Sequence, residues 1–157
     1  MSADLEGLTK AEGTLLALLF SPGESKREGE AIRGRVILAK LLFLLWMNPV
    51  VGPSLKEEVQ FEPYDYGPYS GWIDVALDEL ESRGLVKQER GKTTRISLTK
   101  DGLTEAASWF RGLAPASRSV IEDVKSSFGG MSTTELLERV YAAYPEYASQ
   151  SKWKKRE

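Results

Sequence analysis

The chain has 157 residues, of which 41% are hydrophobic and 28% charged, and its formal net charge is −2. This length and composition allow one sizeable core and do not require a second large domain. Cysteine and histidine are absent, which excludes disulfides, thiolate zinc sites and nucleophiles activated by an imidazole. The 23 carboxylates form no local constellation, so we expect no enzyme activity, no metal and no cofactor. Carboxylate-only metal chemistry is the remaining enzymatic alternative.

The sequence also bears on location. Residues 1–13 are acidic where a signal peptide would be basic. The longest apolar run, residues 36–47, has 12 residues and includes Lys40, which is the length of a buried core helix rather than a membrane span. We expect the Lys40 ammonium group to reach solvent, and we expect a cytoplasmic protein with no membrane partner. One asparagine and three glutamines in the whole chain match a composition reported for thermophile proteins.

The first part of the chain predicts two helices separated by a loop. Thr9 and Glu12 have the spacing of a capping box, which predicts a helix over residues 9–20. Residues 21–30 are polar and contain a Pro-Gly pair, which predicts a loop. A second helix over residues 32–46 is apolar almost all round, so we expect it at the centre of the core.

A short strand and a third helix follow. Val59 and Phe61 begin an alternation that Pro63 interrupts, which predicts at best a short edge strand. The third helix begins between residues 67 and 71 and ends near Gly84, a residue suited to a left-handed C-terminal position. Its apolar face, at helical spacing, consists of Ile73, Ala76, Leu77 and Leu80.

Residues 85–99 form two short alternating segments around an Arg-Gly-Lys turn, which predicts a β-hairpin. The rest of the chain is expected to be helical. The predicted helices span residues 100–112, residues 117–128, and a segment from a second capping box at Ser132 and Glu135 toward Pro145.

The order helix, helix, helix, hairpin, with "LDELESRGLVKQE" leading into "TRISLTKDGL", resembles the winged helix-turn-helix of bacterial and archaeal repressors. There the helix before "RGLV" is the recognition helix and the hairpin is the wing. The stretches "IRGRVILAKLLFLL", "FEPYDYGPYSGWIDVALDELESRGLV" and "ELLERVYAAYPEYASQSK" are similar to a largely uncharacterised group of prokaryotic winged-helix proteins, and more distantly to the toxin-neutralising Panacea antitoxin domain. The resemblance implies a mainly α fold with a small β-hairpin wing (α+β). It implies a winged-helix domain over residues 1–113 and a C-terminal helical extension over residues 114–157 that packs on it or forms a dimer interface.

The third helix does not have the charge of a DNA-reading helix. Residues 70–83 carry four acids and one base, so phosphates would repel this segment. Its outward positions also lack the Arg, Lys, Asn or Gln that reach base edges. We interpret its acidic face, with Asp74, Asp78 and Glu81, either as a solvated surface or as a surface for a basic protein partner.

The hairpin region has the opposite charge. Its cations are Lys87, Arg90, Lys92, Arg95 and Lys100. If four of them each hold one phosphate, the logarithm of the affinity for nucleic acid falls with the logarithm of the salt concentration with a slope of about −3.6. Arg33 and Arg35 extend this basic candidate site. The alternative is that the hairpin charges only prevent edge pairing and that the charges on the second helix only cover the core.

Residues 61–72, "FEPYDYGPYSGW", contain five large aromatic residues. Their rings either pack on neighbouring helices or anchor a protein interface, and one turn can do both. The candidates for partner binding are Tyr64, Tyr66, Tyr69 and Trp72.

Two functional hypotheses follow. The first is a DNA-associated transcriptional regulator that contacts the phosphate backbone of double-stranded DNA through a basic wing. The second is a protein-binding module, antitoxin-like or adaptor-like, in which the acidic third helix and the aromatic turn face another protein. A homodimer formed through the helices after residue 113 is compatible with both.

Overall fold

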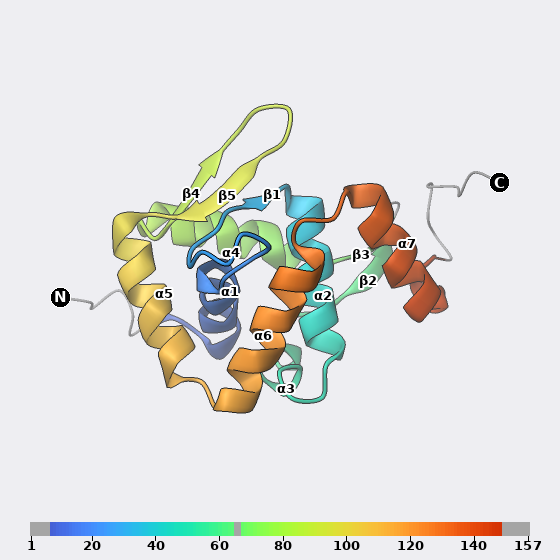
Figure 1. Cartoon of the computed structure of the whole chain (residues 1–157), viewed down its shortest axis with the longest axis horizontal. Helices are drawn as coiled ribbons and strands as arrows, with labels where there is room; N and C mark the ends of the chain where they lie inside the picture. The colour runs from blue at the N-terminus through green and yellow to red at the C-terminus, as the bar shows by residue number, and fades with distance from the viewer. Residues whose placement is uncertain (1–6, 65–66, 149–157) are drawn as a thin grey trace.

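The computed structural model describes residues 7–64 and 67–148. The described chain is mainly helical and contains two small antiparallel sheets (Figure 1). This confirms the expected α+β class. None of the helices in the described ranges has both the length and the apolarity needed to cross a membrane. The elements are α1 (Lys10–Phe20), β1 (Ile32–Arg33), α2 (Arg35–Met47), α3 (Pro53–Lys56), β2 (Glu62–Tyr64), β3 (Gly67–Tyr69), α4 (Gly71–Ser82), β4 (Val86–Glu89), β5 (Arg95–Leu98), α5 (Lys100–Gly112), α6 (Pro115–Phe128), α7 (Thr133–Ala143) and the 3₁₀ turn η2 (Pro145–Ala148).

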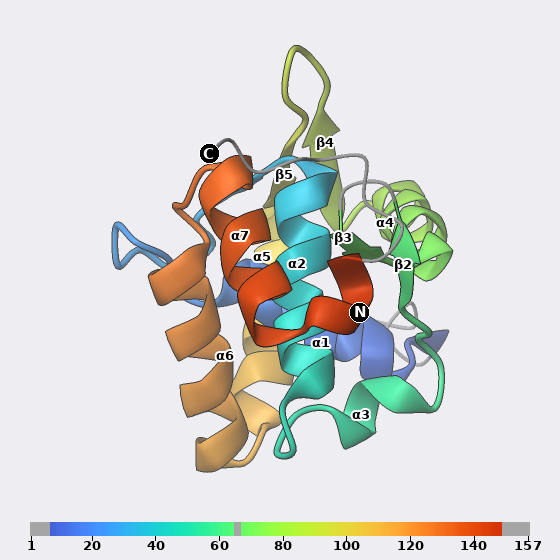
Figure 2. The same ribbon diagram turned by 90° about the vertical axis from the view of Figure 1, so that its right-hand side faces the viewer.

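Helices α1 and α2 form the centre of the core. Residues 15–19 of α1 are at most 1% exposed, and α5 packs along this helix, while α6 and α7 pack against α2 (Figures 1 and 2). The predicted capping box is present, since the Glu12 N–H donates to Thr9 Oγ1 (3.1 Å) and the Thr9 N–H donates to Glu12 Oε1 (2.9 Å). The capped first helix and the central second helix are both confirmed.

The start of the second helix differs from the prediction. Ile32 and Arg33 form strand β1, which pairs antiparallel with β5, and α2 begins only at Arg35. Gly34 lies between them at φ +104°, a conformation that favours glycine, and its N–H donates to Thr94 O (2.7 Å). A two-residue strand has too little alternation to be predicted. It adds a third strand to the hairpin, in the order β1-β5-β4.

Helix α4 and the hairpin match their predictions. Helix α4 begins at Gly71 after Ser70, whose Oγ accepts the N–H of Trp72 (3.3 Å), and the chain leaves it through Gly84 at φ +78°. Strands β4 and β5 pair antiparallel, and the hairpin they form rises from the body of the protein (Figures 1 and 2). The predicted apolar face of the helix is at most 3% exposed at Ile73, Ala76, Leu77 and Leu80.

The aromatic segment forms a strand later than predicted. Val59 and Phe61 are buried, at 0% and 6% exposure, before the strand begins. Strand β2 starts at Glu62 and pairs with β3 in a separate two-stranded ribbon, in which Pro63 lies opposite Pro68. Burial, rather than strand pairing, therefore explains the apolar residues at 59 and 61. The four-residue helix α3, too short to show a period, was also not predicted.

The chain after α5 packs on the core. Helix α6 begins at Pro115 rather than near residue 117, because proline suits the first helical position. The capping box of Ser132 and Glu135 opens α7 as predicted, and Pro145 begins the turn η2 after that helix has ended.

Two lysines are buried in the core. Lys40 is 2% exposed and its Nζ donates to Pro68 O (3.3 Å), so the expectation that it reaches solvent is wrong. Lys125 is 1% exposed and its Nζ donates to Leu19 O (2.8 Å). Burial lowers the pKa of Lys40 to about 8 and that of Lys125 to about 7, in the second case against the charge of Glu30. Each buried ammonium group therefore costs stability near neutral pH.

The Lys125→Met variant should have a midpoint of thermal unfolding several degrees above that of the wild type at pH 6. Below pH 7 the wild-type lysine is protonated in the folded and the unfolded chain, and the folded chain bears the full cost of the buried charge. Between pH 7 and 10.5 only the unfolded chain keeps the proton, so the stability of the wild type rises with pH and the advantage of methionine shrinks. Circular dichroism melts from pH 6 to 10 measure this, with the exposed Lys100→Met as control. A difference that does not change with pH contradicts the assignment.

Candidate functional site

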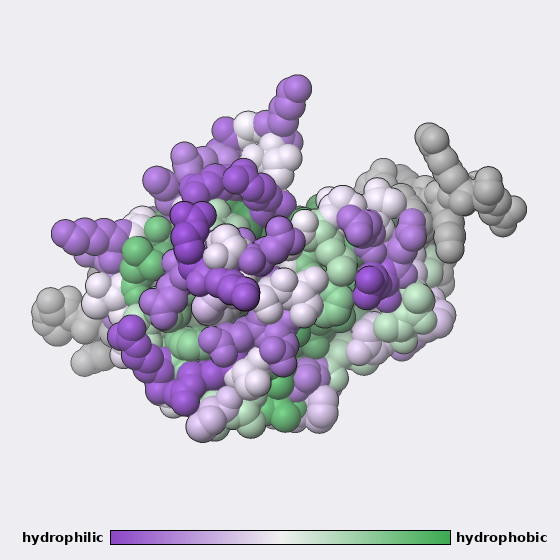
Figure 3. Space-filling view, in the orientation of Figure 1, coloured by the Kyte–Doolittle hydropathy of each residue, from purple (hydrophilic) through white to green (hydrophobic). Residues whose placement is uncertain are grey.

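Basic residues of the hairpin lie on one exposed face of the three-stranded sheet. Arg33, Arg95 and Glu89 are register partners across β1, β5 and β4, so their side chains point to the same face. Arg95 lies 2.7 Å from the Glu89 carboxylate, and Lys87, on the same strand as Glu89, lies 4.0 Å from it. The protruding hairpin carries mostly hydrophilic residues (Figure 3). One carboxylate therefore serves two cations, with a third cation beside them.

The remaining cations of this region are weakly paired or unpaired. Arg90 lies 3.6 Å from Glu81, in an ion pair whose side chains are 60% and 35% exposed. Lys92 in the hairpin loop, Arg33 on β1 and Lys100 at the start of α5 are exposed, and their side chains have no ion pair or hydrogen bond to any residue that the structure describes. Exposed ion pairs contribute about 0–1 kcal/mol, so an incoming anion can displace those on the hairpin.

Arg35 joins α2 to α4 and β4. Its guanidinium donates to Asp74 (2.5 Å), to Asp78 (3.0 Å), and to Gln88 Oε1 from both Nε (3.1 Å) and Nη2 (2.5 Å). The Tyr69 hydroxyl donates to Asp74 as well (2.8 Å). We call these five residues the Arg35 network.

Gln88 extends the Arg35 network along β4. Its side chain is 5% exposed, and its Nε2 donates to Asp78 and to Glu81, each at 3.2 Å. On the outer side of the helix Glu79 pairs with Arg83 at 2.9 Å. All four acids of α4 therefore have partners within the chain, and the acidic face carries less uncompensated charge than the sequence suggests.

The Arg35 network sets the charge states of its members. Hydrogen bonds from Gln88 and Arg35 hold the pKa of Asp78 below its usual value. Burial lowers the pKa of Arg35, but the hydrogen bonds and charges of Asp74 and Asp78 outweigh burial and raise it. Burial, together with the hydrogen bond to Asp74, raises the pKa of Tyr69. At neutral pH the network thus holds a charged guanidinium and a phenol that stays protonated.

The residues proposed from sequence divide into two groups. Arg33, Lys87, Arg90, Lys92 and Arg95 lie around the exposed hairpin, with Lys100 at the start of the following helix. Arg35 was expected beside them, but it is turned toward α4, where Asp74, Asp78 and Glu81 were expected to face a partner. In the structure Asp74 and Asp78 instead accept hydrogen bonds from Arg35, and Glu81 accepts one from Gln88.

The aromatic residues show mixed exposure. Tyr64 is 45% exposed and its ring meets that of Tyr69 edge-on, with centroids 6.0 Å apart. The Trp72 indole is partly buried and its Nε1 donates to Glu58 (2.6 Å). Tyr66 lies outside the described residues. Tyr64 is therefore the described tyrosine of this turn that solvent or a partner can reach most easily.

Sequence reasoning missed the role of Gln88. The residue occupies an inward position of β4, two residues after the buried Val86. A polar residue at an inward strand position, next to an acidic helix, was the available signal. Val75 is different: its outward position follows from helical spacing, and at 70% exposure it is the most exposed large hydrophobic residue described.

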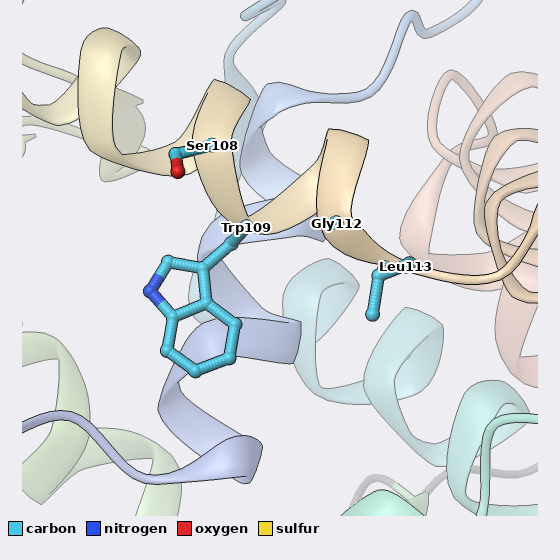
Figure 4. Close-up of a pocket in the computed structure, with 4 residues that line it drawn as sticks. All are labelled: Ser108, Trp109, Gly112 and Leu113. Carbon is cyan, nitrogen blue, oxygen red and sulfur yellow. The ribbon is translucent and has the colours of Figure 1, made fainter.

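An apolar hollow of about 340 Å³ lies on α5 (Figure 4). Its lining residues are Ser108, Trp109, Gly112 and Leu113. The indole of Trp109 packs on α1 at Gly13, where a Cβ atom would collide with the ring. No charged side chain lines this hollow, and within the described ranges no group of acidic residues is arranged to hold a metal ion. The hollow thus offers a ligand no charged group.

Replacing Arg35 with Gln should lower the free energy of unfolding by about 2 kcal/mol, because the half-buried Asp74 and the buried Gln88 lose their charged donor. The matched variant Arg33→Gln should change it by less than about 0.5 kcal/mol, since the Arg33 side chain is exposed and unpaired in the described structure. Urea unfolding of the two variants makes the comparison. Equal losses would show that the network does not stabilise the fold.

No protein-family model matches the sequence, and a search of curated proteins finds no match. The function of the site is therefore argued from its own charges, contacts and exposure.

Proposed function

We propose that this chain is a non-catalytic winged-helix protein that associates with double-stranded DNA through its hairpin, as a transcriptional regulator would. The order α1, α2, α4 and then the hairpin β4–β5 supports this, because three helices followed by a hairpin is the order on which the winged-helix resemblance rests. In this proposal the hairpin is the wing, and it contacts phosphates rather than base edges. The absence of cysteine and histidine from the sequence is the basis for a non-catalytic role.

The observation that carries the proposal is the cluster of exposed cations on a hairpin that stands out from the body (Figures 1 and 3). Arg33 and Arg95 are direct neighbours across two strands, an arrangement that is unfavourable unless an anion compensates it. Glu89 compensates Arg95, which leaves Arg33 and Lys92 for an external anion. A phosphate backbone supplies such anions at regular spacing.

The acidic helix α4 is compatible with this contact because it takes no part in it. Its acids are held by Arg35, Gln88, Arg83 and Arg90. It offers no outward Arg, Lys, Asn or Gln to a major groove. The proposal is therefore a sequence-independent backbone contact made by the hairpin, with α4 held away from the groove.

Binding to a random DNA duplex should weaken with salt with a log-log slope of about −2.7. The region has five cations, Arg33 and the four of the hairpin, and the two carboxylates of Glu81 and Glu89 that pair with some of them. This leaves about three net charges at about −0.9 each. Fluorescence anisotropy from 20 to 200 mM salt measures the slope.

In the triple variant with Arg90, Lys92 and Arg95 replaced by Ala, the affinity for the duplex should hardly depend on salt concentration, because the variant removes the three net positive charges. The single variant Lys10→Ala, on the exposed first turn of α1, is the control and should keep the wild-type slope. No binding at low salt, or a wild-type slope in the triple variant, would refute the proposal.

Val75→Lys tests the position of α4. If the helix stays out of the groove, the added charge changes duplex affinity by less than about twofold and leaves the slope unchanged. If α4 entered the groove, the new lysine would neutralise a phosphate and steepen the slope by about 0.9. The same anisotropy titration distinguishes the two outcomes.

A second candidate function is a protein-binding module, antitoxin-like or adaptor-like. Val75, at 70% exposure, lies on α4 between Asp74 and Asp78, and an exposed apolar residue within an acidic face suits a partner with a basic rim and an apolar centre. Under this candidate the duplex titrations show no binding. Val75→Lys would then abolish the complex with a partner while leaving the melting temperature unchanged.

A further inference from the structure

A second hollow, of about 320 Å³, lies at the foot of the hairpin. Four segments build its walls: strand β1, the first turn of α2, the hairpin loop and the first residue of α7. Both ribbon views place the start of α7 beside the start of α2 below the hairpin (Figures 1 and 2). The residues that line it are Arg33, Gly34, Arg35, Val36, Ile37, Lys92, Thr93, Thr94 and Thr133.

The lining of this hollow is basic and rich in hydroxyl groups. Arg33 and Lys92 come from different segments, and neither side chain has an ion pair or hydrogen bond within the described residues. Of the described residues that line the hollow, none is acidic. The threonine hydroxyls at 93, 94 and 133 have no hydrogen-bond partner in the described part of the chain either. Two unpaired cations and three threonines thus line one concave space.

The walls of the hollow are held in place by the fold. The Gly34 N–H donates to Thr94 O (2.7 Å), which fastens the end of the hairpin loop to the start of α2. Thr133 follows Ser132, whose side chain caps α7 through the Glu135 N–H (3.1 Å). These hydrogen bonds fix the backbone around the hollow at the start of α2, the end of the hairpin loop and the start of α7.

We propose that this hollow binds a phosphate-type oxyanion, held by Arg33 and Lys92 with hydrogen bonds from the threonine hydroxyls. A guanidinium and an ammonium group from two different segments match the charge of a phosphate, and hydroxyl donors fit its remaining oxygens. The first turn of α2 adds a favourable field to the same wall, but the side chains make the site. The volume leaves room for part of the molecule that carries the phosphate.

The contribution of α7 distinguishes this site from a simple wing contact. Thr133 belongs to the C-terminal helices, so an oxyanion bound here links the hairpin, β1 and the C-terminal helices in one place. The oxyanion has two sources, a phosphate of a nucleic acid backbone or a free small phosphate. If the source is a nucleic acid phosphate, the inference rests on the proposed DNA association. If the source is a free small phosphate, it does not.

Titration with inorganic phosphate, at an ionic strength kept constant with sodium chloride, tests the site by ¹H–¹⁵N NMR. The amide signals of Gly34, Thr94 and Thr133 should shift together and saturate. The double variant Arg33→Gln with Lys92→Gln should raise the dissociation constant for phosphate about tenfold. The control Lys100→Gln, which removes an exposed cation outside the hollow, should change it less than twofold. Shifts that do not saturate, or equal weakening in the control, would overturn the proposal.

A second titration, with a 12-base-pair duplex in the presence of phosphate, identifies the source. Duplex that displaces phosphate from these amides assigns the site to the nucleic acid backbone; duplex that binds without displacing it assigns the site to a free phosphate compound. Saturable phosphate binding with no duplex binding leaves the site standing and removes the DNA function. Salt-dependent duplex binding without saturable phosphate binding removes the oxyanion site and leaves the DNA function standing.

Discussion

The contact between Arg35 and the acids of α4 determines how the rest of the charged surface is arranged. The Arg35 guanidinium at the start of α2 donates to Asp74, Asp78 and Gln88. It therefore attaches α2 to both helix α4 and strand β4 at one point. A half-buried, multiply hydrogen-bonded charge contributes more than an exposed pair. Because α4 and β4 are both attached there, the hairpin that β4 begins leaves the body in a defined direction. Two of the acids that look like a free surface in the sequence, Asp74 and Asp78, accept hydrogen bonds from this arginine.

Gly34 separates the two arginines around it into different roles. Its positive φ allows the chain to change from strand β1 to helix α2 within one residue. Arg33 is left on the solvent face of the sheet beside Arg95, and Arg35 points to α4. An external role for the first and an internal role for the second follow from this geometry. The basic hollow lies at the foot of the hairpin that carries the other cations, and the proposed DNA association and the proposed oxyanion site both depend on these positive charges.

Much of the fold was predictable because its signals are local. The capping boxes at Thr9 and Ser132, the apolar spacing of α4 and the turn at the hairpin each lie within a few neighbouring residues, and each is present in the structure. The two-residue strand β1 has no local signal, because its pairing with β5 joins residues more than 60 positions apart. The site was less predictable for the same reason. Nothing in the sequence distinguishes Arg33 from Arg35, and the partners of Arg35 lie 39 to 53 positions away.

The division between Arg33 and Arg35 is the central claim of this account, and the arginine side chains report on it directly. The Nε–Hε signals of both residues can be followed by ¹H–¹⁵N NMR while a random DNA duplex is added. The account predicts that the Arg33 signal shifts or broadens with added duplex, while the Arg35 signal keeps its position and its slow exchange with water. An Arg35 signal that moves with the duplex as far as that of Arg33 would contradict it.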